Sequence, residues 1–200
     1  MVYKRPVFYF TAVALMALAV FFVERPTEQK QGDIIAKPLY ENLDTKTASR
    51  IEIEQLLNGV QLKKEKDQWM VAEMKTGLKG KLEEGEKKDQ RPEETVQWQP
   101  ADNKKVDLTL QTLVDLDITS LAGNNPERFG FFEVNVVGMQ VRVFDAAGKK
   151  LVHLYIGKTG PAFTESYVRK EGEDAVYIAN RYLRSSFSPV TDDWKEKKAN

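Results

Sequence analysis

Residues 50–63, RIEIEQLLNGVQLK, decide the fold, because apolar and polar side chains alternate on both sides of a turn. In an extended strand Ile51 and Ile53 point to one face while the glutamates between and after them point to the other. Asn58-Gly59 is typical of a tight hairpin turn. The sequence therefore predicts a hairpin that turns at Asn58-Gly59 and has one solvated face, followed by a third strand at residues 68–71.

A charged segment, residues 73–95, follows the predicted third strand and consists mainly of Lys, Glu and Gly. Such a composition buries too little apolar surface to offset the entropy lost on ordering. Both charge signs are mixed along it, which argues against a dedicated polyanion site. We expect a solvated, mobile loop, with a docking loop for a charged partner as the alternative.

A helix is predicted to begin after Asp102, whose side chain suits the N-cap position. Val106, Leu110, Leu113 and Val114 then recur at the spacing of one helical face. A helix with a single apolar face of this kind is expected to cover a sheet.

The C-terminal half alternates further strands with short helical elements, in which turn residues separate apolar runs. In chain order we expect a turn at 124–126, a helical turn at 128–131 closed by Gly130, hairpins 139–143/151–156 and 166–169/175–178, and a short helix from Asn180 through Phe187. Strand meanders with a packed helix indicate an α+β fold with a mainly antiparallel sheet.

Residues 7–23 form an uncharged apolar run behind Lys4 and Arg5. As a helix this run is about 26 Å long, near the lower limit for crossing a bilayer. A cleaved signal peptide is the alternative, but the residues before Glu24 make a poor cleavage site. We therefore expect a retained transmembrane anchor, in contact with the lipid bilayer.

Membrane orientation follows from the basic residues before this run. They predict a cytoplasmic N-terminus at residues 1–6 and an extracytoplasmic or periplasmic remainder, held at the inner membrane by one span. Residues 24–47 are polar and contain prolines, so we expect a tether there that becomes ordered near residues 39–43, and the α+β domain at residues 48–198.

Composition excludes several functions. The chain has 30 basic and 30 acidic residues, no cysteine and one histidine. It lacks the basic footprint of a nucleic-acid-binding protein, and it cannot form disulfides, thiolate metal sites or a multi-histidine metal cluster. We expect no cofactor and no metal.

Three local features resemble catalytic motifs, but none of them supports an enzyme. Gly157-Lys158-Thr159 matches the end of a phosphate-binding loop, yet Val152 stands where that motif needs glycine. His153 has no nominated nucleophile, so we interpret it as a packed strand residue. The acid pairs Glu83-Glu84 and Asp192-Asp193 match no calcium loop and are interpreted as solvated charge.

Over residues 48–198 the chain resembles the family catalogued as domain of unknown function 4340. The residues that carry the resemblance are Ile51–Glu54, Val60–Lys64, Trp69, Ala101-Asp102, Val106, Leu113, Phe129–Phe131, Tyr155–Lys158, Tyr167–Arg169, Val176-Tyr177 and Asp193–Lys195. The resemblance implies that residues 73–95 are an insertion. It also implies an anchored envelope protein, with ABC-type transport components of the gliding-motility kind as a partner class.

Aromatic and arginine residues near the C-terminus are the candidate partner-binding residues, because such side chains are enriched in protein interfaces. They are Tyr167, Arg169, Tyr177, Tyr182 and Trp194. The competing interpretation is that the tyrosines pack a sheet face and Trp194 fixes the tail. We expect a noncatalytic protein that binds another envelope component; a small-ligand or glycan-binding module is the alternative.

Overall fold

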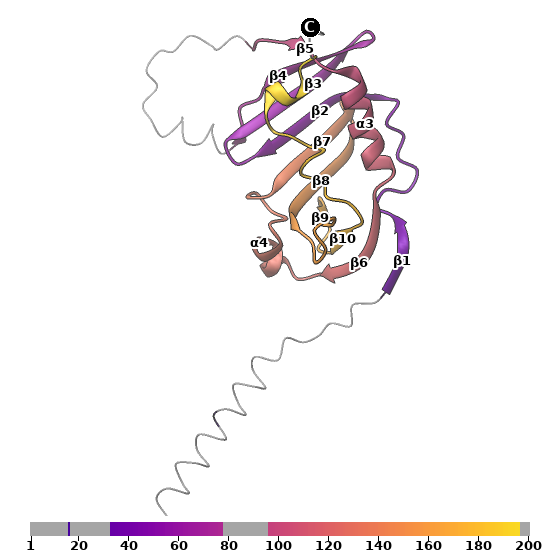
Figure 1. Cartoon of the computed structure of the whole chain (residues 1–200), viewed down its shortest axis with the longest axis vertical. Helices are drawn as coiled ribbons and strands as arrows, with labels where there is room; N and C mark the ends of the chain where they lie inside the picture. The colour runs from indigo at the N-terminus through magenta and orange to yellow at the C-terminus, as the bar shows by residue number, and fades with distance from the viewer. Residues whose placement is uncertain (1–15, 17–32, 78–95, 197–200) are drawn as a thin grey trace, which may run out of the picture. The chain divides into compact units, whose positions relative to one another are not determined.

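A computed structural model describes residue 16 and residues 33–77 and 96–196 (Figure 1). Two parts of the chain discussed above lie outside these residues: the anchor at 7–23 apart from Met16, and most of the charged segment. Within the described residues, no helix is long and apolar enough to cross a membrane.

The described residues of the folded unit form a ten-stranded sheet, flanked by two helices and two 3-10 turns (Figure 1). The elements are β1 (Asp33–Pro38), β2 (Ala48–Gln55), β3 (Asn58–Glu65), β4 (Gln68–Glu73), β5 (Gln99–Pro100), α3 (Asn103–Val114), β6 (Asp117–Gly123), η1 (Pro126–Arg128), α4 (Phe129–Phe132), β7 (Met139–Asp145), β8 (Lys150–Thr159), β9 (Ser166–Lys170), β10 (Val176–Ala179) and η2 (Thr191–Trp194).

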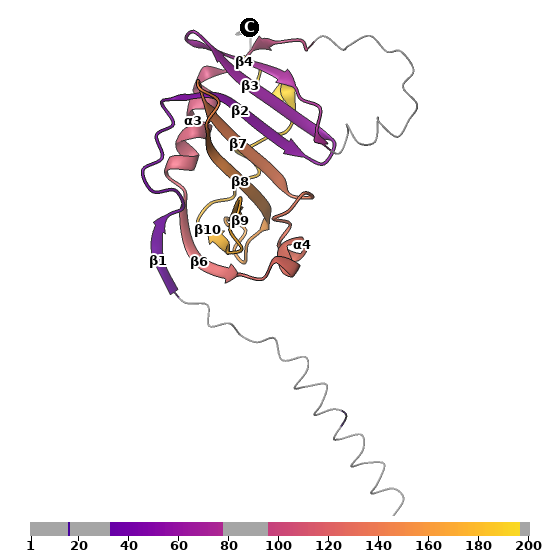
Figure 2. The same ribbon diagram turned by 180° about the vertical axis from the view of Figure 1, so that it is seen from behind.

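The strands lie in the order β1-β6-β10-β9-β8-β7-β2-β3-β4-β5, and each neighbouring pair is antiparallel. This confirms the mainly antiparallel α+β prediction. Helix α3 and η2 cover one face, whereas α4 lies on the opposite face, as the front and back views show (Figures 1 and 2).

The main core fills the α3 face. Ile51 and Ile53 of β2 are buried there with Val141 and Val143 of β7 and with Leu113 of α3. The predicted N-cap is confirmed, because the Asp102 carboxylate accepts a hydrogen bond from the Lys105 amide. The apolar face predicted for α3 is therefore the face that packs on the sheet.

The predicted turn at Asn58-Gly59 is wrong, because Leu56 and Leu57 form the β2–β3 turn instead. Asn58 and Gly59 belong to β3 and pair with Gln55 and Glu54. The observed register places Val60 opposite Ile53 and Leu62 opposite Ile51, which buries all four side chains. A turn at Asn58-Gly59 would have set lysines opposite the isoleucines.

Three other boundaries differ from the prediction. Order was expected from about residue 39 of the tether, but β1 already begins at Asp33 and pairs with β6; the sequence pattern revealed neither strand. Gly130 lies inside α4, and Glu133 ends that helix with a φ of 58°. No helix forms from Asn180 through Phe187; the only regular element described after β10 is η2.

Candidate functional site

The loop around α4 is held directly against the ends of β7 and β8, because two glycines allow backbone to approach backbone. A Cβ atom on Gly138 would lie 1.8 Å from the Glu133 carbonyl oxygen. A Cβ atom on Gly157 would lie 2.1 Å from the Phe132 carbonyl oxygen. Any larger residue would push this loop off the sheet.

Arg169 fastens the same loop from the sheet side. Its side chain lies between the rings of Phe129 and Tyr155, with the guanidinium carbon 4.2 Å and 4.1 Å from their centres. Its Nε donates to the Val134 carbonyl at 2.9 Å, and its Nη1 donates to the Glu173 carbonyl at 3.2 Å. Arg169 is only 8% exposed, so these contacts occupy it inside the domain.

A second arginine, Arg184, ties the loop to the chain after β10. Its Nε donates to the Gly157 carbonyl at 2.9 Å, and its Nη2 pairs with the Glu133 carboxylate at 2.6 Å. Close contact at two glycines and the bonds of two arginines thus hold the loop in a fixed position. The loop therefore presents a preorganised surface.

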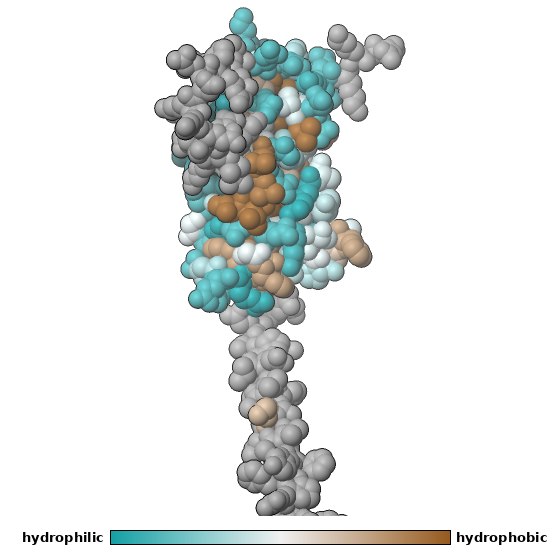
Figure 3. All heavy atoms as spheres, turned by 90° about the vertical axis from the view of Figure 1, so that its left-hand side faces the viewer, coloured by the Kyte–Doolittle hydropathy of each residue, from teal (hydrophilic) through white to brown (hydrophobic). Residues whose placement is uncertain are grey.

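Four aliphatic side chains are exposed beside this loop, and we call them the Leu56 surface. Leu56 and Leu57 form the β2–β3 turn, and Val136 and Val137 form the turn before β7; each is 44–74% exposed. Because Glu54 pairs with Gln140, the continuing β2–β7 register brings the two turns side by side. Figure 3 views the molecule from the left-hand side of Figure 1 and shows hydrophobic residues gathered in the middle of that side.

The backbone at Leu56 is unfavourable for a leucine. Its φ of 52° lies in the left-handed region, which Asn and Gly adopt most readily. The core register explains why a turn stands here, but it does not explain why leucines fill it. Two exposed leucines thus occupy a turn whose backbone favours Asn-Gly.

The structure does not bring the five predicted partner-binding residues together. Tyr167 lies under α4, with its ring centre 4.8 Å from that of Phe132, and burial raises the pKa of its hydroxyl. Tyr177 packs on the α3 face, and Tyr182 is exposed after β10. Trp194 is fully buried and donates from Nε1 to the Ser188 carbonyl, as the tail-fixing interpretation requires.

Sequence reasoning missed the Leu56 surface. The available signal was the pairing of Ile51 and Ile53 with Leu62 and Val60, which moves the turn onto Leu56-Leu57. Matching the apolar positions of the two strands, rather than searching for a turn motif, identifies this register.

A polar cluster lies on the α4 face of β7 and β8, centred on His153. Its Nδ1 lies 2.9 Å from Glu171 Oε1, and its side chain is only 7% exposed. Burial lowers the pKa of the His153 imidazole, against the opposing effect of the Glu171 carboxylate. The lowered pKa favours the uncharged imidazole at neutral pH. Among the described residues, no group of three His, Asp or Glu side chains could hold a metal ion.

A hollow with a volume of about 880 Å³ lies beside β3, β4 and η2. Glu73, Lys75, Asp192 and Lys195 supply its charged lining, and Met74, Val96 and Val190 supply much of its apolar lining. Its walls come from β3, from residues 73–75 at the start of the charged segment, from residues 96–99 just after that segment, and from the C-terminal turn. The hollow thus combines polar and apolar groups, as small-ligand sites do.

Fold and site together describe a single-sheet α+β domain with an exposed apolar surface beside a fixed loop. The chain belongs to the family described as domain of unknown function (DUF4340), whose model matches residues 93–199. The match starts before α3 and includes α4, Arg169 and Trp194, whereas β2, β3 and β4 precede it. No curated protein and no solved structure matches the chain.

Proposed function

We propose that this chain is a noncatalytic membrane protein whose extracytoplasmic domain binds another envelope protein through the Leu56 surface. The apolar run at 7–23 supports a single inner-membrane span with residues 1–6 in the cytoplasm. The resemblance suggests ABC-type transport or a surface assembly as the partner class.

One observation carries this proposal: the domain fixes the loop after α4 rigidly and then exposes aliphatic side chains beside it. Polar Gln55, Asn58 and Asn135 frame the exposed leucines and valines. An apolar centre with a polar rim is the usual composition of a protein interface. Exposed apolar patches with a polar rim commonly mark the sites at which a protein binds a partner.

The test compares two turns with the same backbone feature. Leu56→Asn/Leu57→Gly removes the apolar side chains and relieves the strained φ, so the protein should keep or gain stability while losing its partner. Lys66→Asn/Asp67→Gly makes the same change at the β3–β4 turn, where Lys66 has a φ of 56°, and serves as the matched control. Crosslinking in intact membranes, followed by co-purification, measures the partner.

Loss of a specific crosslinked partner in the Leu56→Asn/Leu57→Gly protein alone would support the proposal. Equal partner recovery from both variants would contradict it. A fall in stability of the first variant would show instead that the leucines serve the fold.

The hollow beside η2 favours a second candidate function, binding of a small ligand or glycan. Its charged residues and its size suit such a ligand. Lys195→Glu should then weaken ligand binding in a thermal-shift screen of sugars and small acids. No ligand-induced shift with the unaltered protein would contradict this second candidate.

A further inference from the structure

The hairpin tip between β8 and β9 is an uncharged, exposed loop. Residues 159–164 read TGPAFT, and Phe163 is 94% exposed, the highest value among the large hydrophobic residues described. The loop has a definite shape, because Glu165 Oε2 accepts from the Ala162 amide and the Glu165 carbonyl accepts from the Gly160 amide. The Glu165 carboxylate is thus bound within the turn, and Phe163 projects outward.

A tyrosine and two cations surround the base of this tip. The Leu183 amide donates to Ser166 Oγ at 3.0 Å, which places exposed Arg181 and Tyr182 beside the hairpin. Lys158 lies in the last part of β8, with its Nζ over the ring of exposed Phe131 at 3.7 Å. In the described ranges neither Lys158 nor Arg181 forms an ion pair with a carboxylate.

Aromatic rings with flanking cations are the composition that proteins place at a membrane surface. The rings enter the headgroup region, and Lys and Arg remain beside the lipid phosphates. The Leu56 surface differs, because its exposed residues are aliphatic and its frame is uncharged. The two surfaces therefore suit different partners.

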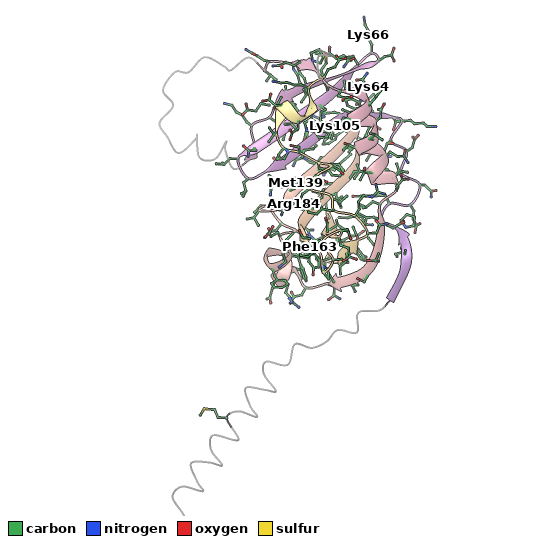
Figure 4. All side chains as sticks on the ribbon, viewed as in Figure 1. Lys64, Lys66, Lys105, Met139, Phe163 and Arg184 are labelled. Carbon is green, nitrogen blue, oxygen red and sulfur yellow. The ribbon has the colours of Figure 1, made fainter. Side chains whose placement is uncertain are left out.

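The chain also limits how far this part of the domain lies from the bilayer. Between the apolar run 7–23 and the start of β1 at Asp33 there are nine residues, 24–32, which span at most about 30–35 Å. Within the folded unit, Phe163 lies in the half where β1 begins, and Lys66 lies at the opposite end (Figure 4).

We propose that the β8–β9 tip docks on the lipid bilayer, with Phe163 and Tyr182 in the headgroup region and Lys158 and Arg181 on lipid phosphates. This inference rests on the membrane anchoring proposed above. It adds that the domain is held in one orientation, with the tip toward the membrane and the β3–β4 turn away from it.

The chain contains no cysteine, so a single label can be introduced at will. Phe163→Cys and, as the distant control, Lys66→Cys are made in the full chain, labelled with an environment-sensitive fluorophore and reconstituted into vesicles. The vesicles contain phosphatidylcholine and phosphatidylglycerol, with a quencher on the upper acyl chain. We expect quenching about threefold greater at position 163, because interfacial groups lie roughly 5–10 Å deep. The double change Lys158→Glu/Arg181→Glu should reduce the quenching at position 163 in these anionic vesicles, because it removes the charges that attract anionic lipid. In vesicles of pure phosphatidylcholine the quenching should not change.

Equal, low quenching at both positions in protein that stays membrane-bound after carbonate extraction would overturn tip docking alone. Protein released by carbonate would overturn the anchor and, with it, the proposed function. A position-163 label that changes only in native membranes, and not in pure lipid, would show a protein partner at the tip and overturn the lipid assignment.

Discussion

The guanidinium carbon of Arg169 lies 4.1 Å from the centre of the Tyr155 ring, on the neighbouring strand β8. This pair connects the sheet to the α4 loop, because Arg169 also donates to the Val134 carbonyl. Through this pair, the α4 face of the sheet supports the loop that borders the Leu56 surface. The planar guanidinium makes five contacts, two with rings and three with carbonyls.

Arg169→Lys should lower the free energy of unfolding by about 2–4 kcal/mol, because an ammonium cannot reach the separate carbonyls and stack on both rings. Urea denaturation measures the change. Arg181→Lys is the control, and at this exposed position it should stay within about 0.5 kcal/mol of the original protein. An unchanged free energy of unfolding for Arg169→Lys would contradict the role of Arg169 in holding the α4 loop.

Gly157→Ala should cost about 2–3 kcal/mol, because its Cβ would meet the Phe132 carbonyl oxygen at 2.1 Å. Gly130→Ala, inside α4, is the matched control, since its Cβ would meet nothing closer than 3.8 Å. That change should be neutral or stabilising by up to about 1 kcal/mol, because alanine favours the helix. Similar losses in the two proteins would refute the close-contact argument. Thermal denaturation distinguishes the cases.

His153 should make the domain less stable as the pH falls below about 6.5. Burial lowers its folded-state pKa below the unfolded value of 6.5, so the unfolded chain takes up a proton first. Lys150, Arg142 and Glu171 face the ring, and Glu171, whose pKa is also lowered, titrates below this window. His153→Gln should flatten the stability profile between pH 7 and 5, as measured by urea midpoints. If the urea midpoint of His153→Gln fell with pH as steeply as that of the original protein, His153 would not be the source of the pH dependence.

Trp194→Ala should cost about 3–5 kcal/mol, because the side chain is fully buried against the core and its indole Nε1 has a carbonyl partner. Trp98→Ala should cost clearly less, since Trp98 is partly exposed and stacks on Lys63. Guanidinium denaturation compares the two. If Trp194→Ala kept its stability and lost only a partner, the interface interpretation of Trp194 would replace the tail-fixing one.

Local patterns predicted the elements whose signal is contained in a few residues. Alternation identified β2, β3, β7 and β8, and the Asp102 cap with its apolar spacing identified α3. Strand β1 was missed because its pairing with β6 joins residues such as Asp33 and Ser120, far apart in the chain. A local sequence pattern cannot show pairing between residues so far apart, and the polar residues around Pro38 are typical of a tether.

The candidate site was less predictable than the fold. Tyr167 and Arg169 were selected for their side-chain chemistry, yet both serve beneath α4. Leu56 and Leu57 precede the predicted turn, and the observed register places them in the turn itself as an exposed surface. Chemistry alone does not distinguish a residue that contacts a partner from one that supports it.

The sequence by itself determined the apolar run, the alternating strands, the capped helix and the absence of cysteine chemistry. The tertiary structure decided which residues reach the surface: the turn at Leu56, the burial of Arg169 and the outward Phe163. The physical reason is that periodicity is local, whereas register and layer order follow from burying the largest apolar area across the whole sheet.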